Sequence, residues 1–290
     1  MGKDLYESFD LANEYYTKAD EILGIHISKL SFEGPLEKLT ETHVTQPAIF
    51  TLSVILHELL SRENASYSMV AGHSLGEYSA LVAAGVMDFE TGLHLVKTRS
   101  QAMQAACESR PGTMAAIIGL EEEKVAEACS AASNQGIVQP ANYNSPGQIA
   151  ISGEVDAVRA AMEQAKEMGA RRAIELVVGG AFHSPLMGAA KIAMQEALED
   201  TSLQDAAVPV YVNKTGNPLQ DAESIKQALI DQIDHPVLWM QTIENMIEDG
   251  ADSFVEVGPG TVLTGLMRRI NKEVESESVS SYRDIIRFEE

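Results

Sequence analysis

The chain has little cysteine, few basic residues and no apolar run long enough to cross a membrane. Its 290 residues include only two cysteines, Cys107 and Cys129, which excludes a disulfide framework and makes a reducing cytoplasm the expected setting. The 21 basic residues stand against 43 acidic ones, a net charge of −22, which argues against nucleic acid or an anionic membrane as a partner. The longest apolar run, residues 48–60, contains His57 and Glu58 and is too short to span a bilayer.

Hydrophobic residues make up 45% of the chain, enough for a large buried core. Helical periodicity predicts helices over residues 4–23, 47–60 with Pro47 at the start, and 89–107 with Asp88 as N-cap. The run at 67–71 predicts a buried strand. The first third is therefore expected to be mostly helical with one strand.

From residue 113 the pattern changes to strand, helix, strand, strand, helix, strand, which is typical of a ferredoxin-like unit. Asn, Ser, Pro and Gly in residues 142–147 suit the turn between the two middle strands. The expected elements are residues 114–118, 121–133, 137–141, 148–153, 155–168 and 172–178.

After Gly180 the chain returns to alternating helices and strands, with a helix opened by Ser184-Pro185 and others over 224–233, after Pro236 and after Gly260. Strands are expected at 208–212 and 254–257, and the polar tail after residue 271 is expected to be peripheral. We therefore predict an α/β fold: a large domain of residues 1–108 and 180–290, interrupted by a small domain of residues 109–179. A small-molecule site is expected in the cleft between them.

The segment 72–76, GHSLG, places Ser74 between two glycines where the short strand meets a helix. This context is typical of a nucleophile elbow, in which a tight turn lifts the serine hydroxyl clear of the backbone. An ordinary strand–turn–helix loop is the alternative, because the motif alone also occurs by chance. Its placement favours Ser74 as a nucleophile.

A serine nucleophile needs a base, and the chain offers seven histidines. His57 and His94 lie in amphipathic helices, and the side chain of His73 diverges from that of Ser74 at a sharp turn. His183 lies in a glycine-containing loop where the small unit rejoins the large one, a good place for a base. These arguments narrow the choice of base only partly. The seven histidines are His26, His43, His57, His73, His94, His183 and His235.

Several segments together resemble the malonyl-CoA:acyl carrier protein transacylases. They are 45–48 (TQPA), 72–80 (GHSLGEYSA), 181–184 (AFHS), 256–260 (EVGPG) and 262–266 (VLTGL), all in the family's order. The resemblance implies an α/β-hydrolase-like large domain with a ferredoxin-like insertion. It further implies a monomeric enzyme of fatty-acid synthesis that holds no bound cofactor. The implied substrate is malonyl-CoA, and the implied partner is acyl carrier protein.

The same resemblance assigns roles to individual residues. Ser74 matches the acyl-accepting nucleophile, His183 its base, and Gln232 the residue whose backbone carbonyl orients that base. The N–H of Leu75 matches an oxyanion donor, and Arg99 matches the arginine that binds the malonyl carboxylate through paired hydrogen bonds.

Further positions are implied more loosely. Phe182 resembles the bulky residue beside the base in malonyl-selective members, and His73 is placed beside the substrate. Two basic pairs fall where relatives dock the acidic carrier protein, although a solvated face is the ordinary role of such pairs. These are Arg171, Arg172, Arg268 and Arg269.

The chain departs from the family at its beginning. Relatives start with a strand and a Gly-Gln-Gly-x-Gln loop that gives the second oxyanion donor, and Met1 aligns just after that loop. We expect the natural start to lie upstream, and we expect apolar surface and unpaired backbone groups where the strand would be. Loss of one oxyanion donor typically costs roughly 100-fold to 1000-fold in turnover.

Two alternatives remain open at this point. A serine esterase or thioesterase of the α/β-hydrolase type shares the elbow, but it would favour a catalytic carboxylate and would have no use for Arg99. A catalytically impaired carrier-protein-binding module would bind acyl carrier protein without acylating Ser74.

Overall fold

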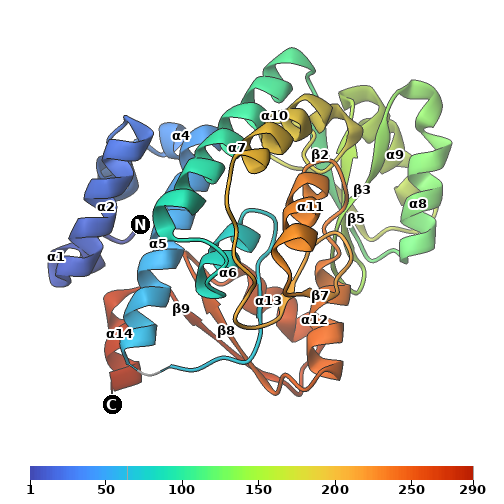
Figure 1. Ribbon diagram of the computed structural model, residues 1–290. Coiled ribbons are helices and arrows are strands. Elements are labelled where there is room, and N and C mark those ends of the chain that lie inside the picture. Colours follow the sequence, from blue (N-terminus) through green and yellow to red (C-terminus); the bar gives the residue numbers. More distant parts are fainter. Residues whose placement is uncertain (64, 290) are drawn as a thin grey trace.

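The computed structural model describes residues 1–63 and 65–289 of the chain. In Figure 1 the N-terminal helices and the unit containing α8 and α9 lie on opposite sides of the molecule, with α5, α6 and α7 between them. The first part of the chain forms α1 (Lys3–Ser8), α2 (Asp10–Leu23), α3 (Ile27–Glu33), α4 (Leu36–Leu39), α5 (Thr42–Arg62), β1 (Val70–Ala71), α6 (Gly76–Ala83) and α7 (Phe89–Ser109).

Three expected boundaries in this part were wrong. The helix expected over 4–23 is broken at Phe9, whose extended backbone (φ −129°, ψ 124°) separates α1 from α2. Helix α5 begins five residues before Pro47, because the Glu41 carbonyl accepts hydrogen bonds from Val44 and Thr45 and forms a first turn ahead of the proline. Strand β1 has two residues instead of five.

The middle of the chain forms a four-stranded antiparallel sheet of order β3-β4-β2-β5 with two helices. The elements are β2 (Thr113–Ile118), α8 (Glu122–Ala131), β3 (Val138–Ser145), β4 (Gln148–Gly153), α9 (Val155–Glu167) and β5 (Arg172–Glu175). Their predicted order is confirmed. Strand β3 runs through most of the expected turn because irregular pairing with β4 lets it continue to Ser145, whereas β5 ends three residues early.

The last part supplies a 3-10 turn (Pro185–Met187), α10 (Gly188–Glu199), β6 (Val210–Tyr211), β7 (Pro218–Leu219), α11 (Ala222–Gln232), α12 (Trp239–Glu248), β8 (Ser253–Val257), α13 (Val262–Ile270), β9 (Glu275–Val279) and α14 (Tyr282–Glu289). Strand β1 pairs in parallel with β6, and β8 pairs in parallel with β9. The tail is therefore not peripheral. Val279 of β9 and Ile285 of α14 are buried in one cluster with residues of α1 and α5.

Helix α5 is the central helix of the large domain. By length and composition it could cross a membrane, but 72% of its most apolar window is buried inside the protein, as expected for a core helix. Its residues enter two hydrophobic clusters, one with α6, α7 and α10 and one with α1, α2 and the tail.

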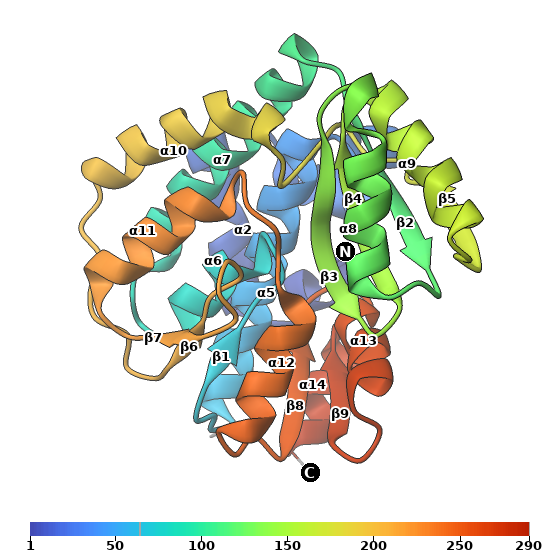
Figure 2. The same ribbon diagram turned by 90° about the vertical axis from the view of Figure 1, so that its right-hand side faces the viewer.

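The small sheet is joined to the large domain near the predicted site. The Tyr143 N–H donates to the Val237 carbonyl at 2.9 Å, and the Val237 N–H donates to the Ala141 carbonyl at 2.8 Å. In Figure 2, β3 stands beside the segment that leads from α11 into α12. This junction brings the end of α11 next to the small domain.

Candidate active site

Ser74 occupies a tight turn between β1 and α6. Its φ of 51° lies in the left-handed region, and His183 (φ 56°) is the only other non-glycine residue in that region among residues 1–63 and 65–289. Such strain is concentrated at functional sites. A Cβ on Gly72 would come within 2.0 Å of the Gly76 backbone, whereas a Cβ on Gly76 would meet nothing within 4 Å. Of the two flanking glycines, the turn requires Gly72.

Asn213 holds this turn from the turn that follows β6. Its Oδ1 accepts from the Ser74 N–H at 2.6 Å, and its Nδ2 donates to the Gly72 carbonyl at 2.7 Å. Its own N–H donates to Glu77 Oε2 at 2.9 Å. Asn213 was not predicted. Its position just after the expected strand at 208–212 could have pointed to it, because that strand ends beside the elbow.

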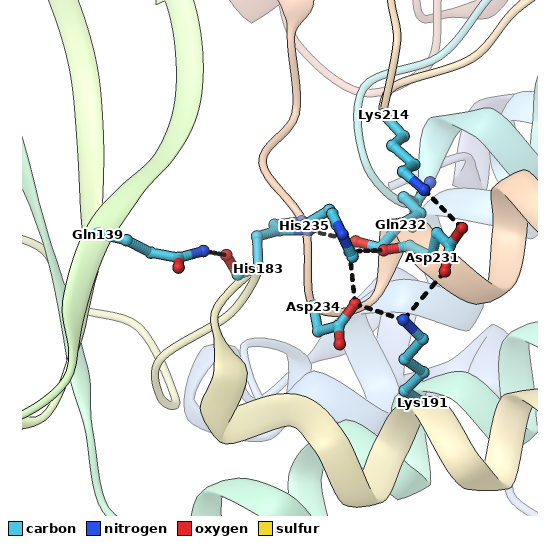
Figure 3. A network of polar contacts seen from close by, with 8 residues as sticks. All are labelled: Gln139, His183, Lys191, Lys214, Asp231, Gln232, Asp234 and His235. Carbon is cyan, nitrogen blue, oxygen red and sulfur yellow. Dashed lines mark hydrogen bonds and ion pairs between the residues drawn. The ribbon is translucent and has the colours of Figure 1, made fainter. Parts of the chain in front are cut away.

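His183 faces the serine hydroxyl. Its Nε2 lies 2.8 Å from Ser74 Oγ, and its Nδ1 lies 2.9 Å from the Gln232 backbone carbonyl. A carbonyl only accepts hydrogen bonds, so Nδ1 carries the proton and Nε2 offers its lone pair to the serine. Figure 3 shows the opposite side of the residue, where Gln139 Nε2 donates to the His183 carbonyl at 3.0 Å. Gln139 was not predicted.

The surroundings keep the His183 imidazole neutral. Burial, aided by the positive charge of Arg99, lowers the pKa of His183 to about 3, because charging a group away from water and beside a like charge is unfavourable. The free site therefore holds a neutral base at physiological pH.

Arg99 projects from α7 to the serine and is 1% exposed. It donates from Nη1 to Gln46 Oε1 at 2.5 Å and from Nη2 to Ser74 Oγ and to Gln232 Oε1, both at 2.9 Å. Within the described part of the chain, no carboxylate lies at ion-pair distance from it, and its buried Nε has no hydrogen-bond partner. No sequence pattern predicted Gln46 and the Gln232 side chain as partners of this cation.

Glu77 is buried behind the serine. Its Oε2 accepts from the Asn213 N–H and, at 3.1 Å, from Gln232 Nε2. Burial raises the pKa of Glu77 to about 7, against the opposing effects of these bonds and of Arg99. The sequence analysis quoted Glu77 only as part of the motif, and a carboxylate three residues after the serine could have suggested a supporting role.

The Leu75 N–H lies at the start of α6, and it meets no acceptor among the residues whose structure is described. An unpaired N–H at a helix start can stabilise a negative oxygen.

His73 Nε2 donates to Asn144 Oδ1 of β3 at 2.9 Å. Phe182 packs against the small sheet. His73 and Leu75 thus line the cavity beside the elbow, whereas the Phe182 side chain packs on the small sheet next to His183 in sequence.

The two arginine pairs lie away from the serine. Arg171 packs on Gly119, whose N–H donates to the Gly147 carbonyl. Arg269 donates to the side chain of Gln148, the residue after Gly147. One arginine of each pair, Arg171 and Arg269, therefore lies near the β3–β4 turn, whereas Arg268 lines a separate pocket with Glu277 and Arg287.

A cavity of about 720 Å³ adjoins the elbow. It is lined by β1 and β8, by His73 and Leu75, and by Trp239. Among the described residues, β1 pairs with β6 alone and β8 pairs with β9 alone.

This fold and site define an acyl transferase of the serine–histidine class. The chain belongs to the acyl transferase domain family, whose model matches residues 1–284. The resemblance to malonyl-CoA:acyl carrier protein transacylases is confirmed by relatives of that name. The one from Bacillus subtilis (strain 168) is 41% identical over 281 residues, covering 97% of this chain and 89% of the relative. The one from Staphylococcus aureus (strain MRSA252) is 40% identical over 286 residues, covering 98% and 92%.

Solved structures agree with this assignment. An acyl carrier protein S-malonyltransferase from Vibrio cholerae O1 has a TM-score of 0.95 at 40% identity, covering 99% of this chain and 94% of that one. A malonyl-transacylase in complex with a type II PKS acyl-carrier protein has a TM-score of 0.95 at 38% identity, covering 99% and 93%. The α/β class of the fold is confirmed.

Proposed function

We propose that this protein moves a malonyl group from malonyl-CoA to the phosphopantetheine thiol of acyl carrier protein, through a malonyl ester on Ser74, in fatty-acid synthesis. The observation that carries the proposal is the buried Arg99 guanidinium. It lies 2.9 Å from the candidate nucleophile and has no carboxylate partner in the described chain. A buried cation without a counter-ion is unfavourable, so the site fits an acyl group that brings its own carboxylate. A simple esterase would have no use for this feature.

Arg99 also links substrate binding to the base. Its charge contributes to the low pKa of His183, and a malonyl carboxylate paired with Arg99 would offset that charge. The pKa of His183 would then rise towards the range of an effective base only when the correct acyl group is bound. The clamp would therefore select the substrate both by binding and by activating the base.

In the first half-reaction the Ser74 oxygen attacks the thioester carbonyl while its proton passes to His183 Nε2. The proton is then available to the departing thiolate of coenzyme A. The Gln232 carbonyl holds Nδ1–H throughout, stabilising the imidazolium less than a carboxylate would. In the second half-reaction His183 takes the proton of the phosphopantetheine thiol, whose sulfur attacks the malonyl ester, and the departing Ser74 oxygen takes that proton back from His183 Nε2. The Leu75 N–H is the proposed donor to the oxyanion in both steps.

We also propose the finer domain description. Residues 109–179 form a ferredoxin-like small domain, which the strand order β3-β4-β2-β5 supports. Residues 1–108 and 180–290 form an α/β-hydrolase-like large domain, supported by the strand–Ser74–helix turn and by the parallel pair β1 and β6. Helix α7 ends at Ser109, so the first boundary falls at its last residue.

The two arginine pairs are proposed as the docking surface for acyl carrier protein. Arg171 and Arg269 both lie near the β3–β4 turn, where they concentrate positive charge on a chain of net charge −22, and local charge of this sign steers an acidic partner. Reversing Arg171 and Arg269 to glutamate should weaken transfer to acyl carrier protein without slowing the loading of Ser74. A matched reversal of the exposed Arg159, on α9, should leave both steps unchanged.

A reducing cytoplasm is the proposed setting. Cys107 and Cys129 are both buried free thiols. Burial raises the pKa of Cys107 to about 11 and that of Cys129 to about 12, so neither is a reactive thiolate.

Intact-protein mass spectrometry tests the proposed function. After mixing with malonyl-CoA, the chain should gain the mass of one malonyl group, and Ser74→Ala should gain none. Adding acyl carrier protein that carries phosphopantetheine should remove the malonyl group from the enzyme and place it on the carrier. Release of free malonate alone would support an esterase, and carrier binding without acylation would support a binding module.

A further inference from the structure

We propose that Asp231 is a positioning residue that, through Lys191 and Lys214, fixes the three segments carrying the Ser74–His183 pair. The proposal rests on the proposed function only in taking Ser74 as an activated nucleophile. Asp231 is the residue before Gln232, at the end of α11. Figure 3 shows its carboxylate between the two lysines, next to the His183–Gln232 hydrogen bond.

One carboxylate bridges both cations. Asp231 Oδ1 lies 2.9 Å from Lys191 Nζ, and Oδ2 lies 2.6 Å from Lys214 Nζ. The Asp231 side chain is 14% exposed, and the lysines are 26% and 33% exposed. Burial alone would raise the pKa of Asp231, but the bonds from Lys214 and Lys191 outweigh it and hold that pKa well below its usual range. The Asp231 carboxylate therefore stays ionised at physiological pH.

Each partner belongs to a segment that holds one part of the site. Lys214 follows Asn213, whose side chain accepts from the Ser74 N–H. Lys191 lies on α10, and only the Pro185–Met187 turn and the start of α10 separate it from His183. Asp231 itself precedes Gln232, whose carbonyl fixes the His183 ring. The two ion pairs thus connect the nucleophile segment, the base segment and the orienting carbonyl.

Neighbouring groups close the turn after Gln232. Asp234 Oδ1 accepts from Lys191 Nζ at 3.0 Å and lies 2.6 Å from His235 Nδ1. His235 Nδ1 also lies 2.9 Å from the Asp231 carbonyl. These contacts fix the backbone of the turn, and with it the direction of the Gln232 carbonyl.

Loss of the Asp231 charge leaves Lys214 without a carboxylate partner among the described residues and leaves Lys191 with Asp234 alone, so two partly buried cations share one counter-ion. Their separation would move the Asn213 segment and α10 apart, and it would lengthen the distance from His183 Nε2 to Ser74 Oγ. A misplacement of about 1 Å can slow a reaction by about 100-fold. We therefore expect Ser74 to react more slowly in a protein that is still folded.

The experiment measures the rate at which a fluorophosphonate reagent modifies Ser74, normalised to the folded fraction. Asp231→Asn is expected to lower this rate by about 10-fold to 100-fold. Lys214→Met should lower it, and the conservative Lys214→Arg should retain most of it. Lys18→Met, which removes a 2.7 Å ion pair with Glu90 far from the site, should leave it unchanged. In steady-state assays kcat should fall while KM stays constant.

The outcomes separate this proposal from the proposed function. Because the reagent needs only an activated serine, a parent chain that is modified but does not transfer malonyl would contradict the function and leave the positioning proposal standing. An Asp231→Asn protein modified at the parent rate would overturn the positioning proposal, as would a parent chain whose Ser74 does not react. Should Asp231→Asn fail to fold, equal rates for Lys214→Met and Lys214→Arg would overturn it.

Discussion

Arg99 controls substrate choice in the proposed reaction, because its buried guanidinium pairs with a charge that only the substrate supplies. Arg99→Ala is expected to reduce malonyl loading of Ser74 by about 100-fold or more relative to acetyl loading. Arg99→Lys should recover little of the loss, since an ammonium cannot form two parallel hydrogen bonds. Loading of the two acyl groups is measured by intact mass against time. Arg110→Ala, an exposed arginine paired with Glu154, is the control, and an unchanged malonyl-to-acetyl ratio in Arg99→Ala would refute the clamp.

Gly72 and Gly76 flank the same serine but differ in how much space surrounds them. Gly72→Ala is expected to lower the free energy of unfolding by about 2 kcal/mol or more, because its Cβ would meet backbone atoms that cannot move aside. Gly76→Ala should be neutral or slightly stabilising, because its Cβ would lie in open space and alanine favours helix. Urea unfolding of the two variants checks this. A Gly76→Ala protein as unstable as Gly72→Ala would show that the turn needs both glycines.

At the scale of elements, α7 carries Arg99 and depends on its first turn. Asp88 caps the helix, with its Oδ1 accepting from the Thr91 N–H at 2.8 Å. Asp88→Ala is expected to lower the free energy of unfolding by about 1 kcal/mol, with little change in malonyl loading because Arg99 lies three turns away. Urea titration measures the loss. Glu127→Ala, an exposed residue within α8, is the control and should cost less than half as much.

The order of helices and strands could be predicted from local sequence patterns. The errors in their boundaries occurred where contacts between distant segments determine the structure. The break at Phe9 and the pairing of β9 with β8 depend on contacts between the two ends of the chain, such as Tyr282 N–H to Asp4 Oδ2. No local window contains such a contact. The length of β1 was overestimated because its edge meets a cavity instead of a strand.

The same distinction applies to the site. The elbow motif and the loop at 179–185 led to Ser74 and His183, and the family resemblance led to Arg99 and Gln232. The structure places all four within one hydrogen-bonded cluster. Asn213, Gln46 and Gln139 were missed because each is a single amide in an unremarkable segment. Only the packing of β6, α5 and β3 around the elbow brings these amides to the site.

For the whole molecule, two buried groups of the site make the free energy of unfolding depend on pH in opposite directions. Burial lowers the pKa of His183 from 6.5 to about 3, so the unfolded chain binds a proton that the folded state excludes. This contribution is present above pH 6.5 and is lost as pH falls towards 3. Burial raises the pKa of Glu77 from 4.5 to about 7, so the folded state keeps a proton that the unfolded chain releases. That contribution is present below pH 4.5 and is lost as pH rises through 7.

Between pH 4.5 and 6.5 the two effects offset each other, each with a slope of about 1.4 kcal/mol per pH unit. Glu77→Gln removes one of them and keeps an oxygen that can accept from the Asn213 N–H. The free energy of unfolding of this variant is therefore expected to rise with pH more steeply than that of the parent, by about 3 kcal/mol across the window. Urea unfolding at intervals of half a pH unit measures both curves, with Glu127→Gln as the exposed control. Parallel curves for Glu77→Gln and the parent would mean that Glu77 is already ionised in the folded protein, since only a protonated Glu77 opposes the slope of His183.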